Sequence, residues 1–280
     1  MNSTPTVSVL TTAFNREAFL TDAIESVLAS SFTDFELIIV DDCSTDNTVE
    51  LAKSYEAKDK RVKVYVNEKN IGDYPNRNKA ASYAKGTYIK YLDSDDTIYP
   101  HGLEVMVNAM GQFPEAGFGL ASKPDGDHPF PSMILPERIY WEHFNGYSHF
   151  DRAPGSLIIL LSAFKKMNGF SGERMVGDLE FWLRIARYYP MVKFQFDLYW
   201  NRLHKGQEFQ TDYAKSVYRR RTKGLINDAL HHKDCPLTGE AKSIIKQKLK
   251  RDRLKNKVLT GLFSVKKIID PGNQDHKISN

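Results

Sequence analysis

Cysteines, long apolar runs and a secretory leader are scarce or missing in this sequence of 280 residues. Its two cysteines, Cys43 and Cys235, do not make a disulfide framework, which favours a reducing compartment. The longest tight apolar stretch, Leu157–Leu161, has the length of a strand, whereas a membrane-spanning helix needs roughly 18 apolar residues. The N-terminus lacks the basic segment and apolar core of a secretory signal. We therefore expect a cytoplasmic protein, with at most a peripheral contact to the inner face of the membrane.

Glycine-rich nucleotide loops are also absent. No G-x-G-x-x-G follows a predicted strand, which argues against a dehydrogenase. A sugar nucleotidyltransferase would need a glycine-rich, arginine-bearing first loop, and the segment Thr11–Arg16 contains no glycine. The composition, with 41% hydrophobic and 12% aromatic residues, is typical of a globular protein. The length suits one large domain, alone or with an appendage.

Positive charge is concentrated near the C-terminus. Between Lys215 and Lys267 the chain carries 16 Lys and Arg residues against four Asp and Glu, a net charge of +12. The whole chain has a net charge of only +4, which leaves −8 on the remainder. We therefore predict a catalytic domain over residues 1–212 and a basic helical appendage over residues 213–280.

Two interpretations of the basic appendage remain open. An apolar stripe at partly helical spacing runs through it, formed by Ile244, Ile245, Leu249 and Leu254. The stripe either packs a solvated helix onto the catalytic domain or dips into an anionic membrane surface, to which the cations are attracted. Nucleic acid is disfavoured, because the interleaved aromatic residues of single-strand binders are missing.

The first 120 residues alternate between strand and helix patterns. Predicted strands are Val7–Thr12, Phe35–Val40, Val62–Val66 and Tyr88–Leu92. Predicted helices lie between them, one capped by Ser44 or Thr45 and another over Tyr74–Ala84. Such repeated units predict an α/β fold with a mainly parallel central sheet and helices on both faces. Further along, we expect a loop over Lys123–Pro136, a strand over Ser156–Leu161 and a helix over Gly177–Tyr188.

Acidic and polar residues follow the predicted strands, where an open α/β sheet binds its ligands. The strongest cluster is Asp93, Asp95 and Asp96, three carboxylates within four residues after the fourth strand. Desolvated carboxylates repel one another, and a hard divalent cation such as Mg²⁺ or Mn²⁺ removes that cost. A solvated acidic turn is the alternative. Asp41 and Asp42 end the second strand, where they would contact a nucleotide or cap the next helix.

Four segments together resemble known enzymes. They are SVLTTAFNREAFLTDAIESVL, DFELIIVDDCSTDNT, NIGDYPNRNKAA and GTYIKYLDSDD, and they resemble the motifs of the family 2 glycosyltransferases of bacterial envelope-polysaccharide synthesis. The resemblance covers roughly residues 6–205 with the motifs in order. It implies the GT-A fold, with a nucleotide half over about residues 1–121 and an acceptor half over about 122–212.

The same resemblance implies roles on the nucleotide side. Thr12 and Phe14 would lie beside the base, and Asp42 would contact the uracil or its equivalent. Arg77 would meet a phosphate or Asp93 with its guanidinium fork.

The metal site is implied in the same way. Asp93 would hold the ribose or shape the metal loop, Asp95 would be the main metal ligand, and Asp96 would assist it. His204 ends a segment that resembles the family's histidine near the diphosphate, which makes it a candidate for metal or phosphate contact.

The resemblance places the catalytic base at the start of a downstream helix. The family's usual Glu-Asp pair is Gly177-Asp178 here, so the base falls on Asp178, with Glu180 as a weaker candidate. Met175 and Val176 would line the acceptor pocket. A helix N-terminus lowers the pKa of a carboxylate, so a useful base needs an opposing influence. Read alone, Asp178 would be an ordinary N-terminal helix charge.

These features predict an inverting, metal-dependent glycosyltransferase. It would move a sugar from a nucleoside-diphosphate sugar, with UDP favoured over dTDP and GDP, to a hydroxyl of a saccharide or lipid-linked saccharide. The first alternative is a haloacid-dehalogenase-like phosphatase, since Leu92–Thr97 mimics its strand-DxD-Thr motif. That class usually places the motif after its first strand, whereas three βα units precede it here. The second alternative is a non-catalytic nucleotide-sugar-binding protein.

Overall fold

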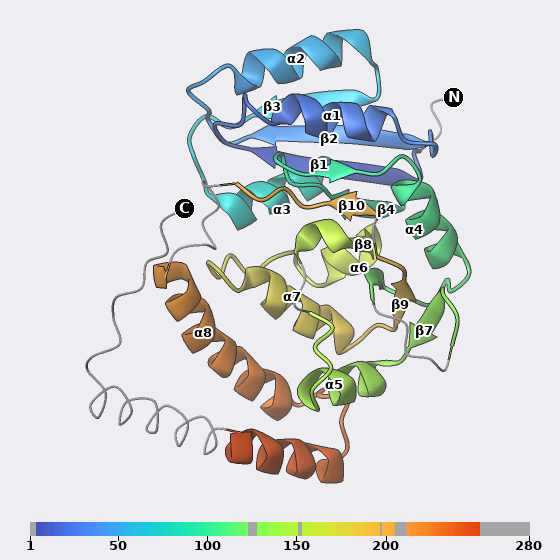
Figure 1. Cartoon of the computed structure of the whole chain (residues 1–280), viewed down its shortest axis with the longest axis vertical. Coiled ribbons are helices and arrows are strands. Elements are labelled where there is room, and N and C mark those ends of the chain that lie inside the picture. Colours follow the sequence, from blue (N-terminus) through green and yellow to red (C-terminus); the bar gives the residue numbers. More distant parts are fainter. Residues whose placement is uncertain (1–3, 123–127, 151–152, 197, 205–211, 253–280) are drawn as a thin grey trace, which may run out of the picture.

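The computed structural model describes residues 4–122, 128–150, 153–196, 198–204 and 212–252. Its centre is an eight-stranded sheet in the order β3-β2-β1-β4-β8-β6-β9-β7 (Figure 1). The strands are β1 (Val7–Ala13), β2 (Phe35–Asp41), β3 (Val62–Val66), β4 (Tyr88–Tyr91), β6 (Phe118–Ala121), β7 (Ser132–Ile134), β8 (Leu157–Leu160) and β9 (Met191–Phe194). A two-stranded sheet pairs β5 (Thr97–Ile98) with β10 (Tyr199–Trp200).

The sheet is parallel from β3 to β4 and mixed beyond β4. Strand β1 pairs in parallel with β2 and β4, and β2 pairs in parallel with β3. Strand β8 is antiparallel to both β4 and β6, and β6 is parallel to β9. Two reversals restore the direction, so β6 and β9 run the same way as β4. The carboxyl ends of β1, β2, β4, β6 and β9 therefore share one edge.

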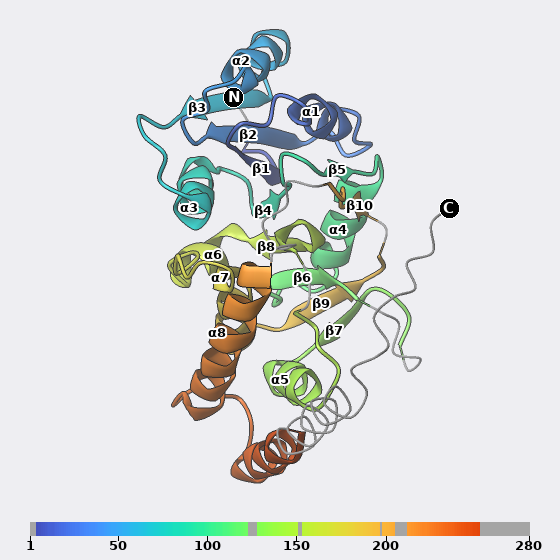
Figure 2. The ribbon, with the colours of Figure 1, turned by 60° about the vertical axis from the view of Figure 1, so that its left-hand side comes forward.

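Helices cover both faces of the sheet. Helices α1 (Leu20–Leu28), α2 (Thr48–Lys58) and α4 (Gly102–Gly111) lie on one face. The other face carries α3 (Asp73–Tyr83), α6 (Leu161–Lys166) and α7 (Gly177–Ala186), with α5 (Pro136–Phe144) and α8 (Asp212–His231) outside them (Figure 2). A short 3₁₀ turn, Pro154–Ser156, precedes β8. The predicted α/β class with helices on both faces is confirmed.

Period-two alternation of apolar residues explains how one strand contributes to the hydrophobic clusters on both faces of the sheet. In β2, Leu37 and Ile39 face the α1 and α2 side, whereas Ile38 and Val40 face the α3 side. All four side chains are buried. A strand covered on both faces reads as a continuous apolar run, which is why these segments stand out in the sequence.

Two local expectations were wrong. Ser44 and Thr45 do not cap α2, which begins at Thr48, because the Ser44 hydroxyl instead donates to Asp41. Strand β7 lies inside Lys123–Pro136, the stretch expected to be loop, and α5 begins at its last residue. Residues 123–127 of that stretch are outside the described part. The sheet as a whole is mainly parallel, as predicted, with antiparallel pairings only at β8 and β7 among its described strands.

The C-terminal segment packs on the α/β domain. Ala229 and Leu230 of α8, Cys235, Leu237 and Ile245 belong to the main core cluster. Residues 239–252 form a further helical stretch. In the predicted stripe, Ile245 is buried and Leu249 packs against the core, whereas Ile244 is 42% exposed.

The remainder of the predicted stripe and tail, including Leu254, lies outside the described residues. Within the described part, no helix is both long enough and apolar enough to cross a membrane.

Candidate active site

Asp42 anchors the loop that follows β3. It is 4% exposed at the end of β2, and its carboxylate accepts hydrogen bonds from the backbone N–H groups of Ile71 (2.9 Å) and Gly72 (2.8 Å). The Asn67 amide donates to the same carboxylate at 2.7 Å. Asn67 also donates to Asn76 of α3 at 2.9 Å. The predicted nucleotide residue therefore shapes the entrance to α3.

Phe14 and Thr12 lie where β1 ends. Thr12 is half-buried, and the ring of Phe14 is 43% exposed. The chain turns sharply at Asn15, which has a φ of 52° and whose side-chain oxygen accepts from the Thr45 N–H at 2.9 Å. This contact joins the loops after β1 and β2. An exposed aromatic ring beside the Asp42 loop can stack on a planar ligand.

Arg77 connects α3 to the segment Asp93–Asp96 after β4, the acidic loop. Its guanidinium contacts Asp73 at 2.8 Å and Asp93 at 2.8 Å. Burial opposes the charge, but the two carboxylates outweigh it and hold the pKa of Arg77 well above its usual value. The ring of Tyr91 lies under the guanidinium at 5.6 Å. The predicted pairing of Arg77 with Asp93 is therefore present.

Asp95 and His204 meet although they are far apart in sequence. His204 Nε2 lies 2.9 Å from Asp95 Oδ2, and the His204 ring packs 4.8 Å from that of Phe19. The Arg16 guanidinium lies 3.9 Å from the same carboxylate oxygen. Arg16 was missed at the sequence level, because a single arginine after a strand carries no pattern of its own.

Asp96 lies deeper than its two acidic neighbours. It is 1% exposed and accepts from the Asn201 amide at 3.0 Å and the Arg202 N–H at 3.0 Å. Burial, reinforced by the charge of Asp93, raises its pKa to about 6. Asp96 thus connects the acidic loop to the segment 201–204, which contains His204.

Lys90 is a buried cation beneath the acidic loop. It is fully buried on β4, and its Nζ donates to the backbone oxygens of Tyr91 (2.8 Å) and Gly155. Burial lowers its pKa to about 7, although Asp93 and Asp96 oppose the shift. Sequence reasoning missed this lysine, because it occupies a position that reads as ordinary strand.

Asp178 stands at the first turn of α7. Its Oδ1 accepts from the Leu179 N–H at 2.7 Å, and the Tyr74 hydroxyl lies 3.4 Å from the same atom. Burial raises its pKa, while the Leu179 N–H, the nearby charge of Arg77 and the Tyr74 hydroxyl pull it down. Burial is the opposing influence that a base at a helix N-terminus requires.

Glu180 and the residues before α7 are arranged differently. Both Glu180 oxygens accept from the Arg184 guanidinium, at 2.7 and 2.9 Å. Met175 is held at a φ of 72°, an uncommon conformation for a bulky side chain, and Val176 is buried. Asp178 is consequently the carboxylate of this turn that lies near Tyr74 and Arg77 on α3.

Asp95 and His204 suit a divalent cation as a pair. Within the described residues no three acidic, histidine or cysteine side chains gather into a metal-binding group. Two protein ligands nevertheless suffice for Mg²⁺ or Mn²⁺ when substrate phosphates and water complete the shell. Asp95 Oδ2 and His204 Nε2 lie 2.9 Å apart, within hydrogen-bonding distance, and these two side chains would hold the cation.

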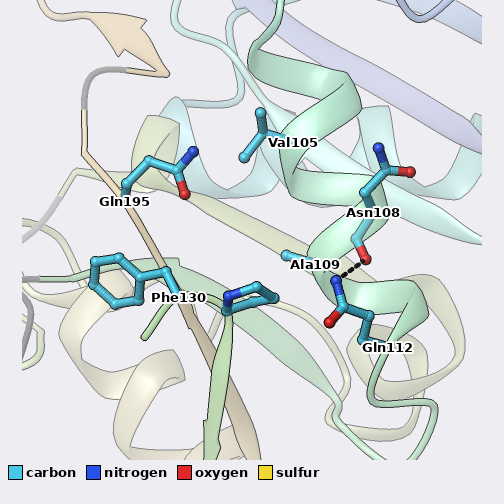
Figure 3. Close-up of a pocket in the computed structure, with 7 residues that line it drawn as sticks. Val105, Asn108, Ala109, Gln112, Phe130 and Gln195 are labelled. Carbon is cyan, nitrogen blue, oxygen red and sulfur yellow. Dashed lines mark hydrogen bonds between the residues drawn. The ribbon is translucent and has the colours of Figure 1, made fainter. Parts of the chain in front are cut away.

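A separate hollow lies beside α4. Its volume is about 230 Å³, and it is lined by Val105, Asn108, Ala109, Gln112, Phe130, Pro131 and Gln195 (Figure 3). None of the described residues around it is charged, and none belongs to the predicted site. The side chains of the candidate site described above lie instead beyond the ends of β1, β2 and β4 and at the start of α7.

The chain is similar in sequence to known glycosyltransferases. A family model described as glycosyl transferase family 2 matches residues 8–167. The chain is 42% identical over 145 residues to a Bacillus subtilis protein named as the teichuronic acid biosynthesis glycosyltransferase TuaG, covering 50% of this chain and 57% of that relative. It is 32% identical over 195 residues to another B. subtilis protein, named as the glycosyltransferase EpsE, covering 66% of this chain and 68% of EpsE.

Solved structures share the fold. S. aureus TarS in complex with UDP-GlcNAc superposes with a TM-score of 0.65 at 22% identity, covering 85% of this chain and 70% of that chain. The Pyrobaculum calidifontis mannosyltransferase PcManGT, in complex with GDP-Man and Mn²⁺, superposes with a TM-score of 0.62 at 12% identity. That match covers 96% of this chain and 82% of the mannosyltransferase. The predicted GT-A fold is confirmed.

Proposed function

Because the chain belongs to glycosyl transferase family 2, we propose that it transfers a sugar from a nucleoside-diphosphate sugar to an acceptor hydroxyl. One observation carries the proposal. The Asp95–His204 pair, the Arg77–Asp93 pair and the half-buried Asp178 converge around the start of α3 and the acidic loop. A metal-ligand pair, a buried guanidinium and a base candidate are what leaving-group stabilisation and acceptor activation require.

Asp178 acts as the general base in this proposal. It takes the proton of the acceptor hydroxyl as the oxygen attacks the anomeric carbon from the face opposite the diphosphate. A single displacement of this kind inverts the configuration at that carbon. Burial raises the pKa of Asp178, which makes its carboxylate a better proton acceptor than an exposed aspartate.

Asp95 and His204 would hold the divalent cation, Mn²⁺ or Mg²⁺, with Asp96 ordering the loop behind them. The cation supplies charge stabilisation for the departing diphosphate. Arg77 fixes Asp93 on the nucleotide side. Arg16, whose guanidinium lies 3.9 Å from Asp95, would add a further positive charge beside the cation.

A UDP-sugar is the favoured donor. The structural relative TarS was crystallised with UDP-GlcNAc, although the mannosyltransferase relative was crystallised with GDP-Man. The exposed ring of Phe14, with Thr12 and the Asp42 loop, would form the base pocket. The name of TuaG refers to teichuronic acid, which supports a saccharide or lipid-linked saccharide of the cell envelope as acceptor.

A donor screen tests the proposal. Purified protein with Mn²⁺ or Mg²⁺ is offered UDP-, dTDP- and GDP-sugars, and release of the nucleoside diphosphate is followed with and without saccharide acceptors. We expect release from one nucleotide class, with UDP first. Hydrolysis of p-nitrophenyl phosphate instead would favour the phosphatase alternative. Tight nucleotide-sugar binding without release under any condition would favour a non-catalytic binding protein.

A further inference from the structure

Tyr74 supplies the cap that the base-bearing helix lacks. The residue before α7, Val176, makes no side-chain capping hydrogen bond. Instead, the backbone N–H of Asp178 donates to the Tyr74 hydroxyl at 3.1 Å, across from α3. The first N–H groups of a helix have no partner within the helix, so an outside acceptor stabilises this turn. The same hydroxyl lies 3.4 Å from Asp178 Oδ1.

Gly177 makes room for this tyrosine. A Cβ atom at position 177 would lie 2.7 Å from one carbon of the Tyr74 ring and 2.8 Å from another. Contacts that short do not occur between real atoms, so any larger residue would displace the ring. Tyr74 and Gly177 are therefore a matched pair, and the close approach brings the hydroxyl to Asp178.

Helix α3 is anchored on both sides of the site. At its start, Gly72 donates to Asp42, and one turn later Arg77 meets Asp93. On the other side, the Asn78 amide exchanges two hydrogen bonds with the backbone of Phe170, at 2.8 and 2.9 Å. The Phe170 ring packs 5.3 Å from that of Tyr74. Tyr74 thus reaches Asp178 from α3, a helix whose position is fixed by its contacts with Asp42 and Asp93.

We propose that Tyr74 is a positioning residue, which holds the Asp178 carboxylate in register with the nucleotide side of the site. The inference rests on the proposed function, in which Asp178 is the base. The phenol accepts the Asp178 N–H and directs its own proton toward Oδ1. One hydroxyl therefore fixes both the backbone and the side chain of the base.

The contact also affects the acidity of the base. The groups that face Asp178 are the Tyr74 hydroxyl and the Arg77 guanidinium from α3, and the Leu179 N–H of its own helix. All three favour the ionised carboxylate. Removing only the hydroxyl, as in Tyr74→Phe, keeps the ring and the burial but removes one of these groups. The pKa of Asp178 then rises. As the pH is lowered, the variant should therefore lose activity at a higher pH than the wild type does.

Turnover measurements form the first arm of the test. We expect Tyr74→Phe to lower kcat by up to about 10²-fold, because small displacements of a reacting group have effects of that size, with little change in KM for the donor. The donor is the sugar nucleotide that turns over fastest in the screen above. The acid limb of the kcat profile should move to higher pH. The matched control is Tyr83→Phe, at the far end of the same helix, which should change neither quantity.

A second arm needs no substrate. Thermal unfolding is compared between wild type and Asp178→Asn over about pH 4–8, first with Tyr74 and then in the Tyr74→Phe background. The raised pKa means that the wild type loses stability relative to D178N as pH rises from the unfolded value, about 3.9, through the folded pKa. The midpoint of this difference should lie at higher pH in the Y74F pair. Equal midpoints would overturn the inference.

A double-mutant cycle tests the Tyr74–Gly177 contact. Gly177→Ala should lower turnover in the presence of Tyr74 but add little to the loss caused by Tyr74→Ala, since the obstructing ring is then gone. Additive losses would contradict the contact. Failure of these arms while D178N remains inactive removes only the role of Tyr74. Full turnover in D178N would instead remove Asp178 as the base, and the proposed mechanism with it.

Discussion

The carboxylates of the candidate site differ in how many hydrogen bonds they accept from the surrounding protein. Asp42 accepts three hydrogen bonds and Asp96 accepts from Asn201 and Arg202, so both are engaged in ordering loops. Asp95 meets His204 and Arg16 through Oδ2, and among the described residues its Oδ1 accepts no hydrogen bond. This difference distinguishes the carboxylates that order loops from Asp95, the proposed metal ligand.

Asp178→Asn tests the base at the residue scale. We expect turnover to fall roughly 10²- to 10⁴-fold with nucleotide affinity unchanged, because the amide cannot accept the acceptor proton. Stability at neutral pH should stay level or increase, since burial disfavours the ionised carboxylate. Steady-state kinetics, calorimetry with UDP and thermal unfolding give the three readouts. Wild-type turnover would exclude Asp178 from the mechanism.

Asp95→Ala and His204→Ala test the metal pair. Each removes one of the two proposed protein ligands, so Mn²⁺-dependent binding of UDP should weaken at least about tenfold in either variant. Calorimetry with UDP, with and without EDTA, measures the effect. Asp228→Ala, an exposed carboxylate on α8, is the control and should bind as the wild type does. UDP binding that is equally strong with EDTA in the wild type would contradict the metal site.

Elements with a clear apolar pattern were predictable, and those built from distant contacts were not. Val62–Val66 coincides with β3, and the strands expected at Phe35–Val40 and Tyr88–Leu92 differ from β2 and β4 by one residue. Strands β6, β7 and β9 are only three or four residues long, too short to give a period of their own.

The residues of the candidate site also fall into two groups, those that a local sequence pattern predicts and those that it does not. The carboxyl-edge rule predicted that Asp42, Asp93 and Asp95 follow strands that end at one edge of the sheet, and β2 and β4 do end there. The contacts of Lys90, Arg16 and Tyr74 arise from packing between separate segments, which a local pattern does not encode. The base was placed only through a resemblance, because Asp178 alone reads as a helix charge.

The loop between β3 and α3 gives a test at the element scale. In Asp42→Asn the amide group faces the N–H donors of Ile71 and Gly72, which leaves a buried donor without an acceptor. We expect a loss of about 1–3 kcal/mol in the free energy of unfolding, measured with urea, and weaker binding of UDP. Asp34→Asn, at an exposed position, is the control. Weakened binding without lost stability would mean that Asp42 contacts the nucleotide directly.

Across the whole molecule, the C-terminal segment has two surfaces of different character. Its buried side, with Leu230, Leu237 and Ile245, completes the core cluster beneath α7. Its outer side exposes Lys246, Lys250 and Arg251 along the stretch 239–252. The packing interpretation is therefore confirmed for the buried side. Removing the whole segment would expose the apolar side chains of the core cluster. A test of membrane contact therefore has to change only the charges on the outer side.

Replacing Lys246, Lys250 and Arg251 together with Glu makes that test. If the outer surface meets anionic lipid, each cation near the surface contributes about 1 kcal/mol, so reversal should abolish capture by phosphatidylserine-containing vesicles at low salt. The wild type should sediment with such vesicles, be released at high salt, and ignore neutral vesicles. The matched control reverses Lys53, Lys60 and Lys63, three exposed lysines of the nucleotide half, and should still sediment. Thermal unfolding verifies that both triple variants keep the fold. Equal capture of wild type and both variants would remove lipid contact from this segment, and with it the argument from charge for a lipid-linked acceptor.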